Sequence, residues 1–184
     1  NNKIPEKKLN TSSRTIGLSN DSIEFLESQK IIHRKNCWSI KKINLYKGKS
    51  SKSFLNFKSN KSNFFMTSYN DLYKSLEASL KRNKLIRINK KNSAKSFLEF
   101  LKKNYEIIII TDANNSLFKK YFSKSITKDY NSIAFTTIIS HKSIKNNVAE
   151  QYFTNCGPLA FLPISNTETS VVFSVFDKDL MKNK

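Results

Sequence analysis

The spacing of apolar residues along the chain predicts three helices in its first part. An asparagine suited to capping precedes apolar residues with helical spacing at Asn20, from which a helix is expected to reach Gln29. A second helix is expected to begin at Asn70, where leucines recur every four residues. A third is expected over Ser93–Lys103, whose apolar residues fall on one face and whose last two lysines suit a helix end.

Alternating and β-branched stretches predict strands between these helices. The expected strands of the first part are Ile40–Tyr46, Phe54–Phe57 as its hairpin partner, Phe64–Ser68 and Leu85–Ile88. The segment Tyr105–Asp112 contains four consecutive isoleucines. Such a run is typical of a strand buried on both faces of a parallel sheet.

After residue 125 the pattern changes to strands without helices between them. The four candidates are Ser132–Ser140, Glu150–Thr154, Leu159–Ile164 and Ser170–Phe176. Consecutive strands of this kind belong to an antiparallel or mixed sheet. The prolines Pro158 and Pro163 favour an edge strand or a bulge for their segment. The sequence therefore predicts an α/β chain of α+β type, with one part over residues 1–124 and a β-sheet part over residues 125–184.

The formal net charge of +19 is large, but it does not by itself indicate a binding partner. It arises from 33 Lys and Arg against 14 Asp and Glu, and the lysines are scattered among ordinary strand residues. Lys, Asn, Ile and Ser are abundant together, as an AT-rich coding sequence would produce, so a nucleic-acid partner is not expected. A weak, salt-sensitive attraction to anionic lipid would still follow from the charge.

The cysteines and the apolar windows exclude several classes. Cys37 and Cys156 are far apart, and with His33 and His141 they form no recognisable metal-site spacing, so free thiols are expected. No window approaches the roughly 18–20 apolar residues of a membrane helix, and the first residues do not form a signal peptide. The expected location is the cytoplasm, with peripheral contact at the inner face of the membrane allowed.

Three segments occur in an order that is found in a known enzyme family. They read R-T-I-G-L-S at Arg14–Ser19, an isoleucine strand with T-D-A-N-N-S-L-F-K at Thr111–Lys119, and G-P-L-A-F-L-P-I-S at Gly157–Ser165 followed by S-V-V-F at Ser170–Phe173. The third is the most specific, since it matches some twenty positions. In these segments the chain resembles the middle of the FAD-dependent aromatic hydroxylases of the ubiquinone-biosynthesis type, which are class A flavoprotein monooxygenases. The resemblance implies part of a Rossmann-like FAD-binding domain followed by a partial substrate-binding sheet.

The resemblance assigns cofactor contacts residue by residue. It places Arg14 against the flavin and its ribityl-phosphate arm. It assigns the polar parts of the cofactor to the candidates Asp112, Asn115, Ser116 and Lys119. Two positions depart from the family pattern, because Ala113 stands for a glycine and Lys119 for an arginine. Alanine resists positive φ, and lysine lacks the planar fork of arginine.

The resemblance also implies a lipophilic substrate. Alternation puts Leu162 and Ile164 on one face of the hairpin and Phe161 and Pro163 on the other. Related hydroxylases that act on benzoates offer polar groups on the corresponding face, whereas Leu162 and Ile164 are apolar. This favours a neutral polyprenylated phenol, hydroxylated with FAD and with NAD(P)H or another electron donor, in contact with the membrane or with other enzymes of quinone synthesis.

Parts of the family pattern are missing, and two alternatives stay open. The chain contains neither the glycine-rich dinucleotide loop nor the Gly-Asp-Ala segment of the family, and its only glycines are Gly17, Gly48 and Gly157. The simplest interpretation is a fragment of a longer protein, inactive by itself. The alternatives are a basic RNA- or ribosome-binding module and a non-catalytic remnant that docks to a partner enzyme.

Overall fold

The structure, a computed structural model, describes residues 14–87, 104–112, 114, 116–122, 126 and 128–176. The described residues form two compact units. One comprises residues up to 83 together with those from 131, and it holds both sheets; the other spans residues 84–130. The first unit combines helices with an antiparallel sheet and a mixed sheet, which confirms the α+β class.

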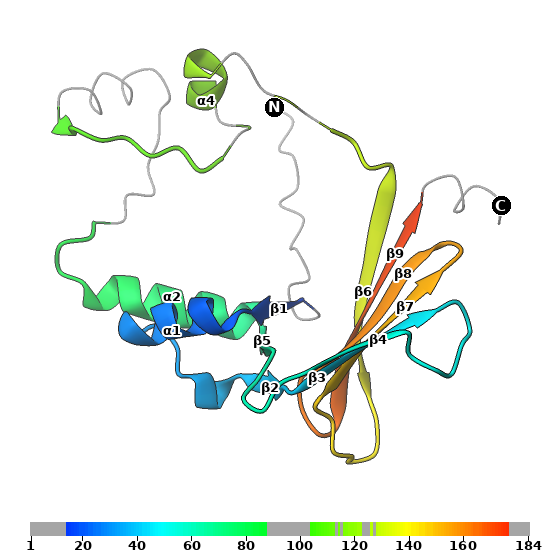
Figure 1. Cartoon of the computed structure of the whole chain (residues 1–184). Coiled ribbons are helices and arrows are strands. Elements are labelled where there is room, and N and C mark those ends of the chain that lie inside the picture. The colour runs from blue at the N-terminus through cyan, green and yellow to red at the C-terminus, as the bar shows by residue number, and fades with distance from the viewer. Residues whose placement is uncertain are drawn as a thin grey trace. The chain divides into compact units, whose positions relative to one another are not determined.

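The smaller sheet has three strands, in the order β1 (Thr15–Leu18), β5 (Phe64–Ser68) and β2 (Trp38–Ile40). The central strand β5 is antiparallel to both neighbours. Helix α1 (Asn20–Ser28) follows β1, and helix α2 (Tyr69–Arg82) follows β5 without a loop (Figure 1). A short 3-10 turn, η2 (Arg34–Asn36), leads into β2. This sheet and helix α1 share a core of four buried residues, Leu18, Ile23, Ile32 and Phe65.

Both helices begin close to the predicted position, but a serine caps each of them. The hydroxyl of Ser19 accepts a hydrogen bond from the backbone N–H of Ser22, at 3.1 Å. Ser68 caps α2 in the same way through the N–H of Asp71, at 3.0 Å. The predicted cap Asn20 is instead the first residue of α1, and its amide donates to the carbonyl of Ser62. The prediction missed the true caps because serine and asparagine satisfy the same N–H groups.

The larger sheet has six strands in the order β4-β3-β7-β8-β9-β6. Their bounds are β3 (Lys42–Lys47), β4 (Leu55–Lys58), β6 (Ser132–Ser140), β7 (Val148–Thr154), β8 (Gly157–Pro163) and β9 (Glu168–Phe176). The pair β3 and β7 is parallel, and every other neighbouring pair is antiparallel. The four strands predicted after residue 125 are confirmed, as are the β3–β4 hairpin and β5. The division expected at residue 124 stays a prediction. The larger sheet contains strands from both sides of this position, since β3 pairs with β7.

One extended segment belongs to both sheets. The strands β2 and β3 are separated only by Lys41, whose N–H donates to the carbonyl of Asn147 at 3.0 Å. Just before this point Ile40 is fully buried, and it packs with Met66 of the smaller sheet and Ala149 of the larger. The junction between the sheets is therefore an apolar contact around Ile40.

Some predictions in the stretch from residue 85 to residue 112 are wrong or lie outside the described residues. The segment Tyr105–Asp112 is not a strand, and Ile107 and Ile109 are 79% and 83% exposed. A buried strand needs hydrogen-bonded neighbours, and among the described strands none pairs with this segment. Residues 85–87 are likewise not in a strand, and Ser93–Lys103 and Ile88 lie outside the described residues. The described unit from 84 to 130 does contain a short helix, α4 (Ser116–Tyr121).

The two prolines of β8 lie in an inner strand, so the predicted edge position is wrong. Pro158 faces Phe153 of β7 but has no partner on β9, and Pro163 faces Thr169 of β9 but has no partner on β7. Each proline thus lies where β8 pairs on one side only. The missing N–H is tolerated there because the proline is paired on one side and has no ladder partner on the other.

The outer face of the larger sheet, defined by Tyr46, Glu150 and Tyr152, carries a polar cluster. The rings of Tyr46 and Tyr152 are stacked with centroids 4.5 Å apart, across the parallel pair β3–β7. Their hydroxyls donate to the two carboxylate oxygens of Glu150, at 3.0 and 3.3 Å. Burial, followed by this hydrogen bond, raises the pKa of Tyr46; burial and then the charge of Glu150 raise the pKa of Tyr152.

We expect Gly157→Ala to destabilise the sheet at the start of β8. Gly157 has a φ of +140°, and an added Cβ would lie 1.9 Å from the carbonyl oxygen of Ser174. The free energy of unfolding should fall by about 3 kcal/mol, measured by chemical denaturation. The matched control is Gly17→Ala, whose new Cβ would approach only side-chain atoms, the ring of Phe64 at 3.4 Å and the sulfur of Met66 at 3.6 Å. Equal effects of the two changes would contradict this account.

The raised tyrosine pKa values predict a loss of stability in alkali. Below the ordinary value of 10.0 both tyrosines are protonated in the folded and the unfolded chain. Above it the unfolded chain ionises first, so the free energy of unfolding falls as the pH rises through the folded pKa values. The double variant Tyr46→Phe with Tyr152→Phe should show a shallower fall in melting temperature above pH 10.0 than the native chain. Identical slopes would show that the two phenols do not contribute.

Candidate functional site

A cavity lies where β1 meets the inner face of the larger sheet, the face that carries Ala149 and Ser170. The hydroxyl of Thr15 donates to the hydroxyl of Ser170 at 2.9 Å. Ser170 is fully buried. This bond joins the first described strand to the last described strand, across 155 positions of the sequence. It fixes one side of the cavity.

The cavity has a volume of about 410 Å³, within the range usual for small-molecule sites. Its lining residues come from β1 and the residue before it, from β6 and β9, and from the start of α2: Arg14, Thr15, Ile16, Tyr69, Ala134, Thr136, Ser170 and Val172. On the sheet side, Thr136 of β6 is directly opposite Val172 of β9. The sheet therefore supplies a floor of small and apolar side chains.

Arg14 and Tyr69 give the cavity its chemical character. The carbonyl of Arg14 accepts a hydrogen bond from the N–H of Tyr69 at 2.9 Å, which holds the start of α2 beside β1. Arg14 is exposed and lines the cavity, so it supplies a cation there. Thr15 and Ser170 bond to each other. The arrangement fits a flat aromatic ring that lies on apolar walls and turns an electronegative edge toward a guanidinium group.

These residues fit the ring system of a flavin, but not the whole of FAD. A ring with polar edge atoms matches the apolar floor and Arg14. The pyrophosphate of FAD is commonly held by a glycine-rich loop at a helix start. Such a loop needs closely spaced glycines, and in this sequence the glycines, Gly17, Gly48 and Gly157, are far apart. The described cavity can thus account for a ring, whereas the phosphates would need residues beyond it.

The predicted site residues of the first unit fall in two places. Arg14 lines the cavity, as just described. Leu162 and Ile164 share one face of the hairpin as predicted, but they pack against the buried cluster of Ile40, Met66 and Ala149. Phe161 is on the opposite face, where its ring meets Tyr152 edge to face. Leu162 is directly across from Ser170 in the β8–β9 ladder, so it lies next to the cavity floor.

The remaining predicted cofactor residues belong to the second unit. Asp112 is exposed there, and its carboxylate accepts a hydrogen bond from the N–H of Asn114 at 2.9 Å. Ser116 is the first residue of α4, and Lys119 is exposed within that helix. Asn115 lies outside the described residues. Asp112 therefore closes a local turn ahead of α4, and its role toward a cofactor stays a prediction.

Sequence reasoning missed the floor of the cavity. Large and small side chains alternate along Ile133–Thr136: Ala134 and Thr136 are small, whereas Ile133 and Phe135 are large. In a strand, such alternation places the large side chains on one face and the small ones on the other. The small face leaves room for a ligand, and this pattern was the available signal. It could not be recognised without knowing which face meets β1.

Among the comparisons with known proteins, only the solved structures give matches, one of them a distant likeness. No protein-family model and no curated protein matches the chain. Among solved structures, the fold is similar to the crystal structure of tetracycline destructase Tet(51), with a TM-score of 0.45 and 9% sequence identity. The alignment covers 91% of this chain and 47% of that chain, so the chain spans about half of that protein's length.

The contact that closes the cavity can be tested by a double-mutant cycle. Thr15→Val and Ser170→Ala each remove one hydroxyl of the buried pair. Their coupling energy should be about 1 kcal/mol, measured by chemical denaturation of both single variants and the double variant. The control cycle is Ser53→Ala with Asn56→Ala, which breaks an exposed side-chain hydrogen bond. A coupling energy no larger than that of the control would contradict the packing of β1 on β9.

Proposed function

We propose that the chain is part of a flavin-dependent monooxygenase and that its β1–β9 cavity binds an aromatic ring during hydroxylation. The observation that carries the proposal is the position of Arg14. The residue singled out by the R-T-I-G-L-S segment lines a cavity of about 410 Å³ whose sheet side includes Ser170 and Val172 of the S-V-V-F segment. Two segments that resemble the aromatic hydroxylases thus border one cavity, although they are far apart in sequence.

Each group in the cavity has a simple role in this proposal. A bound flavin supplies the oxygen-transfer chemistry. Arg14 orients the electronegative edge of the ring system. Ile16, Ala134 and Val172 exclude water from the ring, and the Thr15–Ser170 bond keeps β1 closed over the floor.

The proposed substrate is a lipophilic phenol, of the polyprenylated kind used in ubiquinone biosynthesis. The cavity is lined by the apolar side chains of Ile16, Ala134 and Val172 beside Arg14 and hydroxyl groups, and its lining contains no carboxylate, which suits a neutral ring. Leu162 and Ile164 extend the apolar surface beside Ser170, and we propose that they support the substrate side from the adjacent core. The proposal includes an electron donor such as NAD(P)H, cofactor contacts through Asp112, Asn115, Ser116 and Lys119, and a working site at the inner face of the membrane.

Binding measurements on the chain test the proposal. An alkyl-substituted phenol is titrated by calorimetry, and riboflavin, which carries the ring without the pyrophosphate, by its fluorescence anisotropy. Ala134→Phe fills the floor and should weaken phenol binding about tenfold or more, equivalent to about 1.4 kcal/mol. Arg14→Gln should weaken riboflavin binding by a similar factor while leaving the fold intact.

The matched control is Lys52→Gln, which removes one exposed positive charge in the β3–β4 connection, away from the cavity. It should leave both affinities unchanged. The proposal fails if neither ligand binds the native chain, or if Ala134→Phe and Arg14→Gln bind both ligands as the native chain does.

A further inference from the structure

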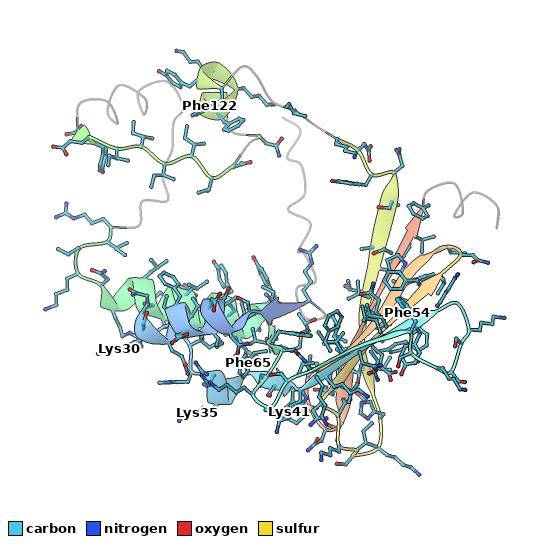
Figure 2. The ribbon with its side chains drawn as sticks, in the orientation of Figure 1. Lys30, Lys35, Lys41, Phe54, Phe65 and Phe122 are labelled. Atoms are coloured by element: carbon cyan, nitrogen blue, oxygen red, sulfur yellow. The ribbon has the colours of Figure 1, made fainter. Side chains whose placement is uncertain are left out.

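A second cavity of the first unit gathers lysines around the single tryptophan of the chain. Its volume is about 370 Å³. Its lining comes from the segment that includes β2, from the residues before β7 and from the β8–β9 turn: Lys35, Cys37, Trp38, Ser39, Lys41, Lys145, Asn146, Asn147 and Asn166. Three of these residues are lysines and none is a carboxylate. In Figure 2, the labelled Lys35 and Lys41 lie along the same side of this unit.

The frame of this cavity is held by hydrogen bonds between distant segments. The indole N–H of Trp38 donates to the carbonyl of Asn146 at 2.5 Å. The amide of Asn146, a residue only 9% exposed, donates to the carbonyl of Ser165 at 2.8 Å and to the hydroxyl of Thr169 at 3.0 Å. The backbone of Lys41 is fixed to Asn147 at 3.0 Å. Lys41 therefore starts from an anchored backbone position, and Lys145 directly precedes the bonded Asn146, which lowers the cost of ordering these two side chains on a ligand.

The charges of this cavity are not offset within its walls. Among the described residues, the ion pairs join Arg34 to Glu27 and Lys81 to Glu77, so neither contains a cavity lysine. Two carboxylates, those of Asp71 and Glu168, line a neighbouring cavity that shares Lys35, Cys37 and Trp38 with this one. Three ammonium groups around one opening repel one another, and an anion between them would turn that repulsion into attraction.

We propose that the Lys35–Lys41–Lys145 cavity binds a small phosphorylated anion that carries at least two negative charges. Ammonium groups provide the point charges that phosphate oxygens accept, and the side-chain amides of Asn147 and Asn166 can donate further hydrogen bonds. The ring of Trp38 adds an aromatic wall beside these donors. A free oligophosphate and the headgroup of a phospholipid both offer this phosphate chemistry, and the experiment separates these two sources.

Trp38 provides the readout, because its fluorescence is the only tryptophan signal of the chain. The native chain is titrated at fixed ionic strength with inorganic pyrophosphate. It is titrated separately with phosphatidylcholine vesicles that contain a phosphoinositide, and with pure phosphatidylcholine vesicles. Saturation with pyrophosphate assigns the site to a free oligophosphate. Saturation only with phosphoinositide vesicles assigns it to a lipid headgroup.

The decisive comparison uses two triple variants of equal charge. The site variant carries Lys35→Gln, Lys41→Gln and Lys145→Gln, and the control carries Lys49→Gln, Lys52→Gln and Lys74→Gln at exposed positions outside the cavity. Each lowers the formal net charge from +19 by 3, to +16. The site variant should bind about tenfold more weakly, and the control should bind within about twofold of the native chain.

Two outcomes overturn the proposal. The first is equal weakening in both triple variants, which would show that diffuse net charge attracts the anion. The second is the absence of a saturable signal with any of the three titrants. The single change Lys145→Gln serves as a second variant if the triple variant loses its fold by circular dichroism, and unchanged binding by this variant would count against the site.

Discussion

The structure depends on the burial of Ile40, where one extended segment passes from the smaller sheet to the larger. A strand that ends one sheet and begins another must satisfy its backbone groups on both sides of the crossing. Lys41 does this with Asn147 through its N–H and with Ser59 through its carbonyl. Ile40 fills the space between the sheets with Met66 and Ala149. Because this contact is apolar and fully buried, it fixes the position of one sheet on the other.

Both cavities follow from this junction. The strand β5 pairs with β2 on one side and β1 on the other, so the crossing at Ile40 also determines where β1 lies over the larger sheet. The result is the Thr15–Ser170 contact and the cavity beside it. On the other side of the crossing, Lys41 and Trp38 border the lysine cavity. A single packing arrangement therefore generates two cavities with different linings, one that combines Arg14 with small and apolar side chains and one that contains three lysines.

Local patterns were sufficient to predict most elements of the first unit. Alternation identified the strands Phe64–Ser68 and Ser132–Ser140 at their observed bounds. In each strand the side chains on one face are more apolar or larger than those on the other face. The isoleucine run at 107–110 misled the prediction, since composition reports a preference for burial but not whether neighbouring strands are present. The prolines of β8 misled it for a related reason: their tolerance depends on where the flanking ladders stop.

The sites were less predictable, because they depend on contacts between distant segments. The motif singled out Arg14, which lines the cavity although its role toward a cofactor stays a prediction, and alternation predicted the shared face of Leu162 and Ile164. Ala134 and Thr136 became recognisable only once β1 was known to lie over them. The lysine cavity shows the same limit, since Lys41 and Lys145 are more than a hundred residues apart and come together through the Lys41–Asn147 bond.

The fold shows that the positive charge of the chain is locally concentrated, although the lysines are scattered along the sequence. At the level of sequence the lysines are scattered, and a net charge of +19 is a general source of repulsion. The two described ion pairs are on the surface, where such pairs contribute little stability. The fold nevertheless brings three lysines to one opening that contains no carboxylate. A bound anion would act at the point where repulsion is concentrated, so its binding would stabilise the junction at Lys41 as well as occupy the cavity.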